Sequence, residues 1–488
     1  MTRREGWKMK RKLLIAIPAL FLATSFLATP AIADPRPQSP SEANDAKAIY
    51  KLAQDKFQSD LKIYEDKRRA INQSFKEAID KVFKSFEQVP NYQKTEINMR
   101  FSSVQLFKFW PIHLCFASIF LFACSKGTTG GTTPPTPPRP TPVWDPNAVR
   151  GAWITTAAST ALDSRDNVKA MVTNCKNAGI NNIYVVVYNN ARTIYPSNVM
   201  HSLIGVRQLE RYAGRDPLQE CIDEAKLVGI RVHAWFEYGF SSSFSANGGL
   251  IVAAKPSWAA RDINGQLVVK NGFDWLNGIH PEVQQYMIDL FKEVVTKYEV
   301  DGVQGDDRLP ALPSNGGYDP YTISLYKAEH AGASPPGSGT DAGWIRWRAN
   351  KLNAFVKRLR NEVKAIKPAI VFSMSPSPYP FSINEYLQDW PTWVDSSWVD
   401  AVMPQCYRYT LADYDNVLNQ QKSFYKNTSV AFYPGVLVKS GATIQSDGLM
   451  SQFIQSNRNK GFKGEVFFFY EGVKDKLSWF QGLYPYIK

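Results

Sequence analysis

The chain has 488 residues, of which 44% are hydrophobic and 13% aromatic, enough for one large globular domain with added segments. Its net charge of +13 is spread out, since residues 1–98 hold 18 Lys and Arg against 12 Asp and Glu and the remaining excess is dispersed. A nucleic-acid-binding surface needs clustered cations, so this composition argues against such a partner. The five cysteines and five histidines show no zinc-ligand spacing, so we expect no metal and no cofactor.

The N-terminal region has the layout of a secretory signal peptide. A basic start at residues 10–12 precedes an apolar run at residues 13–27, and Ala31-Ile32-Ala33 forms a typical cleavage site. We therefore expect residues 1–33 to be a signal peptide. Residues 34–98 are a charged segment with apolar residues at helical spacing, which predicts a helix or helical hairpin.

A second export signal follows at residues 99–124. An apolar stretch, residues 109–123, ends in Leu121-Phe122-Ala123-Cys124, which resembles the lipobox of bacterial lipoproteins. On this resemblance Cys124 would carry the lipid that anchors the protein to the membrane outside the cytoplasm; the alternative is a single transmembrane helix. Since two complete export signals in one chain make little sense, we interpret residues 1–98 as a foreign piece, joined by fusion or by a misplaced start codon.

The segment after this signal, residues 125–147, is rich in Gly, Thr and Pro, a composition typical of an extended linker. Beyond it, from residue 148 to residue 488, short β-branched or aromatic runs alternate with amphipathic helices. Eight alternations and a hydrophobic last run predict an α/β fold, a closed (β/α)8 or TIM barrel. The expected strands are residues 149–156, 182–188, 231–238, 302–306, 370–375, 401–407, 430–436 and 464–470.

The candidate catalytic residues are carboxylic acids at strand ends, because barrel enzymes place their reacting groups at the C-terminal ends of the strands. Hydrolysis of an acetal needs one protonated and one ionised carboxyl group. We expect Asp306 to be the nucleophile or charge stabiliser and Glu237 the proton donor, with Glu471 as the rival donor. Asp307 would be the brace beside Asp306. The expected substrate-binding residues are Asn189, His233, Trp235, Arg308, Gln405, Tyr407 and Arg408.

Structural alternatives stay open for several of these residues. Glu471 could form a simple salt bridge, and Glu237 could bind a substrate hydroxyl group instead of donating a proton. His233 lies inside its strand, where a histidine is as often a core group as a ligand. Trp235 and Tyr407 could stack on sugar rings or fill the layers of the barrel.

Three segments of the predicted barrel carry most of these candidates: Val232-His233-Ala234-Trp235-Phe236-Glu237, Asp301-Gly302-Val303-Gln304-Gly305-Asp306-Asp307 and Met403-Pro404-Gln405-Cys406-Tyr407. They resemble the bacterial glycosyl-hydrolase-10-like lipoprotein family. The resemblance implies a TIM-barrel glycosidase of envelope glycans, such as peptidoglycan strands, with its acidic pair at Asp306 and Asp307. Where an aromatic residue commonly flanks this pair, the chain has Gly305 and Arg308. That departure favours an anionic or N-acetylated glycan over a neutral one.

The sequence therefore predicts a glycoside hydrolase that acts as a monomer on an extracytoplasmic polysaccharide. The alternative is a surface lipoprotein that kept the barrel and binds sugar without turnover. A metal-dependent hydrolase or deacetylase is disfavoured, because no His-x-His pair stands at a strand end.

Overall fold

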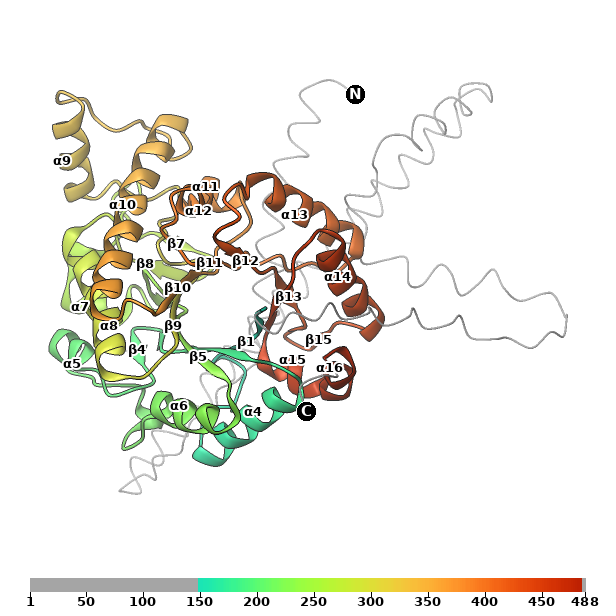
Figure 1. Cartoon of the computed structure of the whole chain (residues 1–488). Helices are drawn as coiled ribbons and strands as arrows, with labels where there is room; N and C mark the ends of the chain where they lie inside the picture. The colour runs from blue at the N-terminus through green and yellow to red at the C-terminus, as the bar shows by residue number, and fades with distance from the viewer. Residues whose placement is uncertain (1–147, 485–488) are drawn as a thin grey trace, which may run out of the picture. The chain divides into compact units, whose positions relative to one another are not determined.

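The computed structural model describes residues 148–484, which form a barrel of parallel strands surrounded by helices (Figure 1). The predicted signal peptide, charged helical segment, lipoprotein signal with Cys124, and linker all lie outside these residues. Within residues 148–484, no helix has the length and apolar character needed to cross a bilayer.

The central sheet confirms the predicted barrel. Its strands run in the order β12-β11-β10-β9-β5-β2-β1-β16-β13, and every pairing is parallel. They are β1 (Arg150–Ile154), β2 (Asn182–Val186), β5 (Arg231–Phe236), β9 (Gly302–Gly305), β10 (Val371–Met374), β11 (Ala401–Val402), β12 (Ala431–Phe432), β13 (Gly435–Leu437) and β16 (Glu465–Phe468).

The barrel closes through its seventh strand, which is divided into β12 and β13 by Tyr433 and Pro434. β12 pairs with β11, whereas β13 pairs with β16, so this one segment joins the two ends of the sheet. The division has a local cause, because proline has no N–H to donate to a strand ladder. The nine short strands are thus the eight predicted ones with one of them interrupted.

The outer layer consists of helices whose starts are encoded locally. Ser164, Asp216, Asp341, Thr410 and Ser446 each accept a backbone N–H of the first turn of the helix that follows. The helices are α4 (Arg165–Asn177), α6 (Pro217–Val228), α8 (Pro281–Lys297), α10 (Ala342–Ile366), α11 (Phe381–Tyr386), α12 (Trp390–Asp395), α13 (Leu411–Phe424), α14 (Asp447–Asn459), α15 (Tyr470–Asp475) and α16 (Leu477–Leu483).

Several insertions depart from the plain βα alternation. The largest follows β5 and contains a three-stranded antiparallel sheet in the order β6-β8-β7, hereafter the small sheet. A second insertion contains α9, which packs on α10 through ring contacts between Tyr326 and Trp344, 5.1 Å apart. The inserted elements are β3 (Tyr188–Asn189), β4 (Arg192–Thr193), α5 (Asn198–Ile204), β6 (Ser241–Phe244), α7 (Gly249–Ala254), β7 (Val269–Lys270), β8 (Phe273–Trp275), α9 (Pro320–Glu329), β14 (Lys439–Ser440), β15 (Thr443–Ile444) and two short 3-10 helices (Glu210–Tyr212 and Pro256–Trp258).

The interior of the barrel is filled by side chains that alternate along the strands. On β5, Phe236 faces outward and stacks on Phe291 of α8, with ring centroids 3.7 Å apart. Trp153 on β1 donates its Nε1–H to Gln304 Oε1 on β9, at 2.7 Å. Because β2 and β5 stand between these two strands in the sheet, this hydrogen bond spans the interior. Trp153 and Gln304 are therefore bonded to each other across the barrel, beneath the strand ends.

Candidate active site

Asp306 directly follows β9, and its carboxylate is held by the ends of three adjacent strands. The residue is only 2% exposed. Its Oδ2 accepts a hydrogen bond from Arg308 Nη2 at 2.8 Å. Its Oδ1 accepts from Gln405 Nε2 at 2.8 Å, after β11, and from Ser375 Oγ at 3.4 Å, after β10. The predicted residues Asp306, Arg308 and Gln405 are thus in direct contact.

Arg308 joins the acidic residues of two strand ends. Its Nη1 lies 3.2 Å from Asp307 Oδ1, and its Nε donates to the backbone oxygen of Glu237 at 3.0 Å. The guanidinium also lies over the Phe273 ring of the small sheet, 4.6 Å from its centroid. We call Glu237, Asp306, Asp307 and Arg308 the Arg308 cluster. Because its nitrogens are engaged by the protein itself, Arg308 neutralises internal carboxylates.

Glu237 follows β5 and is anchored from the opposite side of the cluster. Its Oε2 accepts a hydrogen bond from Asn189 Nδ2 at 2.6 Å and lies 3.4 Å from the Thr155 hydroxyl at the end of β1. The side chain is half-buried. Both hydrogen bonds end on the same oxygen, so the carboxyl group is oriented by one oxygen while Oε1 takes part in neither.

The electrostatics of the Arg308 cluster favour a retained proton. Burial raises the pKa of Glu237 above its usual value, although Arg308 and the Asn189 hydrogen bond oppose the shift. Burial and then the charge of Asp307 raise the pKa of Asp306 well above its usual value. One guanidinium cannot neutralise three carboxyl groups, so protonation of one of them relieves the remaining repulsion.

The predicted aromatic residues lie beside this cluster. The Tyr407 ring is 5.1 Å from Phe468 and 6.4 Å from Trp153. Burial, and then the charges of Asp306 and Asp307, raise the pKa of Tyr407. Trp235 is buried against Trp153, and its indole N–H has no hydrogen-bond partner among the described residues. Arg408 donates to the backbone oxygen of Tyr407 at 2.6 Å.

Two predicted residues have contacts of a different kind. Glu471, on α15, accepts from Ser159 Oγ at 2.8 Å and pairs with Lys474 at 2.5 Å, so its contacts are those of the salt-bridge alternative. His233 is buried in the barrel core, where its Nε2 lies 2.8 Å from Asn182 Oδ1 and its ring stacks on Tyr184. Burial lowers the His233 pKa to about 3, so its ring is neutral. The structure does not bring either residue into the Arg308 cluster.

Sequence reasoning missed several contacts of the cluster. Thr155 is a hydroxyl residue at the end of a predicted strand, and that position was the signal that could have identified it. Ser375, at the end of the fifth predicted strand, has a binding role at most in the sequence interpretation, and it contacts Asp306. Phe273 belongs to the small sheet, which the barrel pattern does not predict. Among residues 148–484, no group of three or more His, Cys, Asp and Glu side chains is arranged to hold a metal ion.

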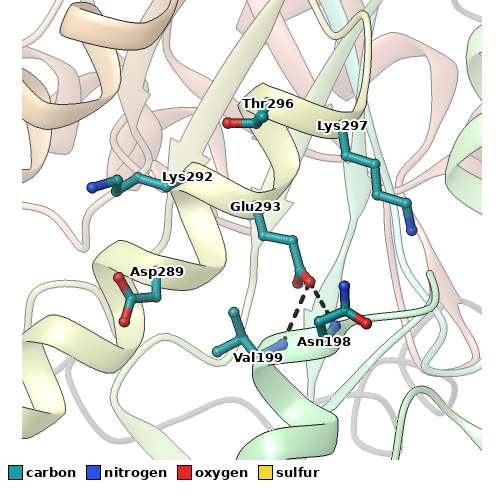
Figure 2. A pocket seen from close by; sticks show the side chains of 7 residues that line it. All are labelled: Asn198, Val199, Asp289, Lys292, Glu293, Thr296 and Lys297. Carbon is teal, nitrogen blue, oxygen red and sulfur yellow. Dashed lines mark hydrogen bonds between the residues drawn. The ribbon is translucent and has the colours of Figure 1, made fainter.

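A surface hollow between α5 and α8 is separate from the Arg308 cluster (Figure 2). Its central carboxylate, Glu293, accepts hydrogen bonds from the backbone N–H groups of Asn198 at 2.6 Å and Val199 at 3.4 Å. Glu293 therefore caps the start of α5, a structural role. The residues that line the hollow are Asn198, Val199, Asp289, Lys292, Glu293, Thr296 and Lys297.

Solved structures with the same fold are glycosidase domains. The chain superposes on the PgaB (BpsB) glycoside hydrolase domain from Bordetella bronchiseptica with a TM-score of 0.51 and 12% identity, over 69% of this chain and 98% of that one. It superposes on the catalytic domain of β-amylase from Paenibacillus polymyxa with a TM-score of 0.51 and 9% identity, over 70% and 98%. At such identities the likeness concerns the fold alone.

Sequence relatives point the same way. The chain is 26% identical over 382 residues to the glycosyl hydrolase DigH of Escherichia coli K12, covering 67% of this chain and 82% of DigH. It is 23% identical over 325 residues to the glycosyl hydrolase YngK of Bacillus subtilis 168, covering 60% and 59%. The family described as glycosyl hydrolase-like 10 matches residues 148–447, which include the whole Arg308 cluster. The chain therefore belongs to the glycosyl hydrolase-like 10 family.

Proposed function

We propose that this protein is a glycoside hydrolase that cleaves an extracytoplasmic polysaccharide, with the glycan strands of peptidoglycan as the substrate class. The observation that carries the proposal is the Arg308 cluster, in which Glu237, Asp306 and Asp307 meet at the C-terminal ends of the barrel strands. That is where barrel enzymes carry out their chemistry. Membership in a glycosyl hydrolase-like family agrees with it, and peptidoglycan rests on the resemblance of the motifs.

Glu237 is the proton donor in this proposal. A general acid must be protonated at the working pH, and burial raises the pKa of Glu237 in that direction. It must also reach the glycosidic oxygen, which suits a half-buried side chain better than a fully buried one. The Asn189 hydrogen bond to Oε2 orients the carboxyl group, so Oε1 is the atom that delivers the proton.

Asp307 supplies the negative charge that an oxocarbenium-like transition state needs, and Asp306 adds to it once it has lost the proton that burial favours. Asp306 is held on both oxygens and is nearly inaccessible, whereas the Asp307 side chain is 23% exposed. Arg308 contacts both carboxyl groups, at 2.8 and 3.2 Å. We therefore assign Asp306 to charge stabilisation, and Asp307, the more exposed of the two, to direct contact with the sugar.

The remaining roles follow from position. Tyr407 and Trp235 border the acidic pair and would line the sugar site, together with Asn189 and Gln405. The protein would act as a monomer outside the cytoplasm, either secreted or held to the membrane by a lipid on Cys124. The localisation rests on the sequence motifs of the N-terminal region.

The test is the release of new reducing ends from purified peptidoglycan glycan strands. The full-length protein should release them, and its Asp306→Asn variant should not. Binding of the strands by both proteins without any product would contradict the proposal and would support a sugar-binding protein that has lost turnover. Labelling with a radioactive fatty acid, lost in a Cys124→Ala variant, tests the anchor.

A further inference from the structure

We propose that the small sheet and the neighbouring helix α11 form a second sugar-binding site beside the Arg308 cluster, made of Phe244, Phe273, Tyr386 and Phe381. We call these four residues the aromatic platform. Its occupant would be uncharged pyranose rings, such as N-acetylglucosamine, that lie further along the glycan than the bond to be cleaved. The inference deepens the proposed function and rests on it.

The first half of the platform is one face of the small sheet. Phe244 on β6 pairs with Phe273 on β8, which pairs with Lys270 on β7, so the three side chains form a row across the strands. The two phenyl rings meet at 5.2 Å in an edge-to-face contact. Arg308 lies over Phe273, so this face of the sheet is the one that contacts the Arg308 cluster.

The turn between β7 and β8 fixes this arrangement. Asn271 and Gly272 both have positive φ, 53° and 80°, as a two-residue hairpin of the type I′ class requires. A Cβ atom on Gly272 would lie 2.6 Å from the Phe244 ring, so glycine lets the ring lie against the turn. The hairpin thereby sets the register that aligns Phe273 with Lys270 and supports Phe244.

The second half of the platform comes from α11. Lys270 Nζ lies 4.6 Å from the centre of the Tyr386 ring, and Asn271 Nδ2 donates to the Tyr386 hydroxyl at 2.8 Å. The Phe381 ring follows, 6.0 Å from Tyr386. Contacts therefore run without interruption from Arg308 to Phe381.

Exposure and charge indicate what the platform binds. Phe244 is 48% exposed and Phe381 52% exposed, whereas Tyr386 is only 7% exposed and links them as a buried support. Apolar side chains that are exposed within one patch indicate binding more than singly exposed ones do. Lys270 is paired with Glu385 at 2.5 Å, and the adjacent cluster has more carboxylates than guanidinium groups. Flat aromatic rings without free positive charge suit the apolar faces of uncharged sugars. Of the anionic or N-acetylated glycans that Gly305 and Arg308 suggested, the platform therefore favours the N-acetylated one.

The test is binding of N-acetylglucosamine oligomers of two to six units, measured by calorimetry on full-length Asp306→Asn protein, which should not turn them over. Affinity should rise with length. When Phe244→Ala and Phe381→Ala are both added to the Asp306→Asn protein, binding of the hexamer should weaken at least tenfold and binding of the dimer should stay unchanged. Phe244→Trp in the same protein should retain hexamer binding. Leu227→Ala, on the outer surface of α6 and 79% exposed, is the matched control.

Equal hexamer affinities with and without the two phenylalanines would overturn the platform, as would affinity that is absent or independent of length in the parent protein. The two proposals can fail separately. Reducing ends released by the wild-type protein without a platform effect would uphold hydrolysis alone. A platform effect in a protein that releases none would uphold sugar binding alone.

Discussion

Glu465 and Asp306 are buried carboxylates that each have an arginine partner, and they lie at opposite ends of the barrel strands. Glu465 begins β16 and is fully buried. Arg458 donates a hydrogen bond to each of its carboxylate oxygens, from Nη1 to Oε2 at 2.7 Å and from Nη2 to Oε1 at 2.9 Å. Asp306 follows β9 at the opposite end and is bound by Arg308. Arg458 neutralises one carboxylate, whereas Arg308 lies in a cluster that has three carboxyl groups.

The difference lies in charge balance. Glu465 also accepts hydrogen bonds from Tyr484 and Asn457, so its charge is matched and its lone pairs are used. Such a pair holds a structure together, and removing one partner is costly. In the Arg308 cluster three carboxyl groups share one guanidinium. Burial raises the pKa of Glu237, and burial followed by the charge of Asp307 raises the pKa of Asp306. Burial with an arginine therefore does not by itself indicate a catalytic acid, and our proposal rests instead on the surplus of carboxyl groups at the C-terminal strand ends.

Asp306→Asn should give the largest effect, a loss of about 10³-fold in the rate of glycan hydrolysis, because a preorganised charge is removed from the transition state. The same substitution should make the folded protein more stable, relative to wild type, as pH rises. The pKa of Asp306 is higher in the folded than in the unfolded protein, so its carboxyl group stabilises the fold at pH values below its unfolded pKa, and this stabilisation is lost as pH rises through the folded pKa. The variant should therefore lose less melting temperature than wild type between pH 4 and pH 8. Activity within tenfold of wild type would remove Asp306 from the mechanism.

Glu465→Gln should reverse this pattern. Breaking the pair of Glu465 with Arg458 leaves Arg458 charged and buried, so the free energy of unfolding should fall by about 3 kcal/mol. The hydrolysis rate per folded molecule should stay at the wild-type value, because the substitution is at the other end of the barrel. Urea unfolding and active-site-normalised rates measure the two quantities. Unchanged stability would show that the comparison of the two clusters is wrong.

Glu237→Gln should lower the hydrolysis rate by about 10²-fold, the usual contribution of a general acid. In the wild-type protein, kcat/KM should fall as pH rises through the raised pKa of Glu237, because the donor must carry its proton. That alkaline limb should vanish in the variant. A limb that persists unchanged would assign the donor role to another group, with Glu471→Gln as the variant to measure next.

Asn189→Ala should give the smallest effect, a displacement of the alkaline limb to higher pH by less than about one unit. Its hydrogen bond favours the ionised form of Glu237, so its loss raises the pKa of Glu237 further. Thr155→Val removes a weaker contact, 3.4 Å against 2.6 Å, and should displace the limb less. Displacement to lower pH in the Asn189 variant would contradict the assigned role of the hydrogen bond.

The sequence by itself determined the barrel and the strand ends at which the acids lie. Eight runs of strand-forming residues, each followed by a helix with an apolar stripe, predict parallel βα units. Glu237 and Asp306 come directly after the runs that form β5 and β9, so the sequence places them at the C-terminal ends of these strands. The pattern also predicted some strands to be longer than they are. It continues through Pro404 and Pro434, but proline has no N–H to donate to the hydrogen bonds between strands.

Only the tertiary structure decided which polar residues meet. Arg308 lies two residues after Asp306 in sequence, yet its other partners, Glu237 and Phe273, come from the end of β5 and from the small sheet. Glu471 and His233 occupied strand positions as promising as that of Glu237, but Lys474 and Asn182 engage them instead. Residue spacing along a strand states which face a side chain takes, whereas its partners depend on how distant segments pack, which no local pattern encodes.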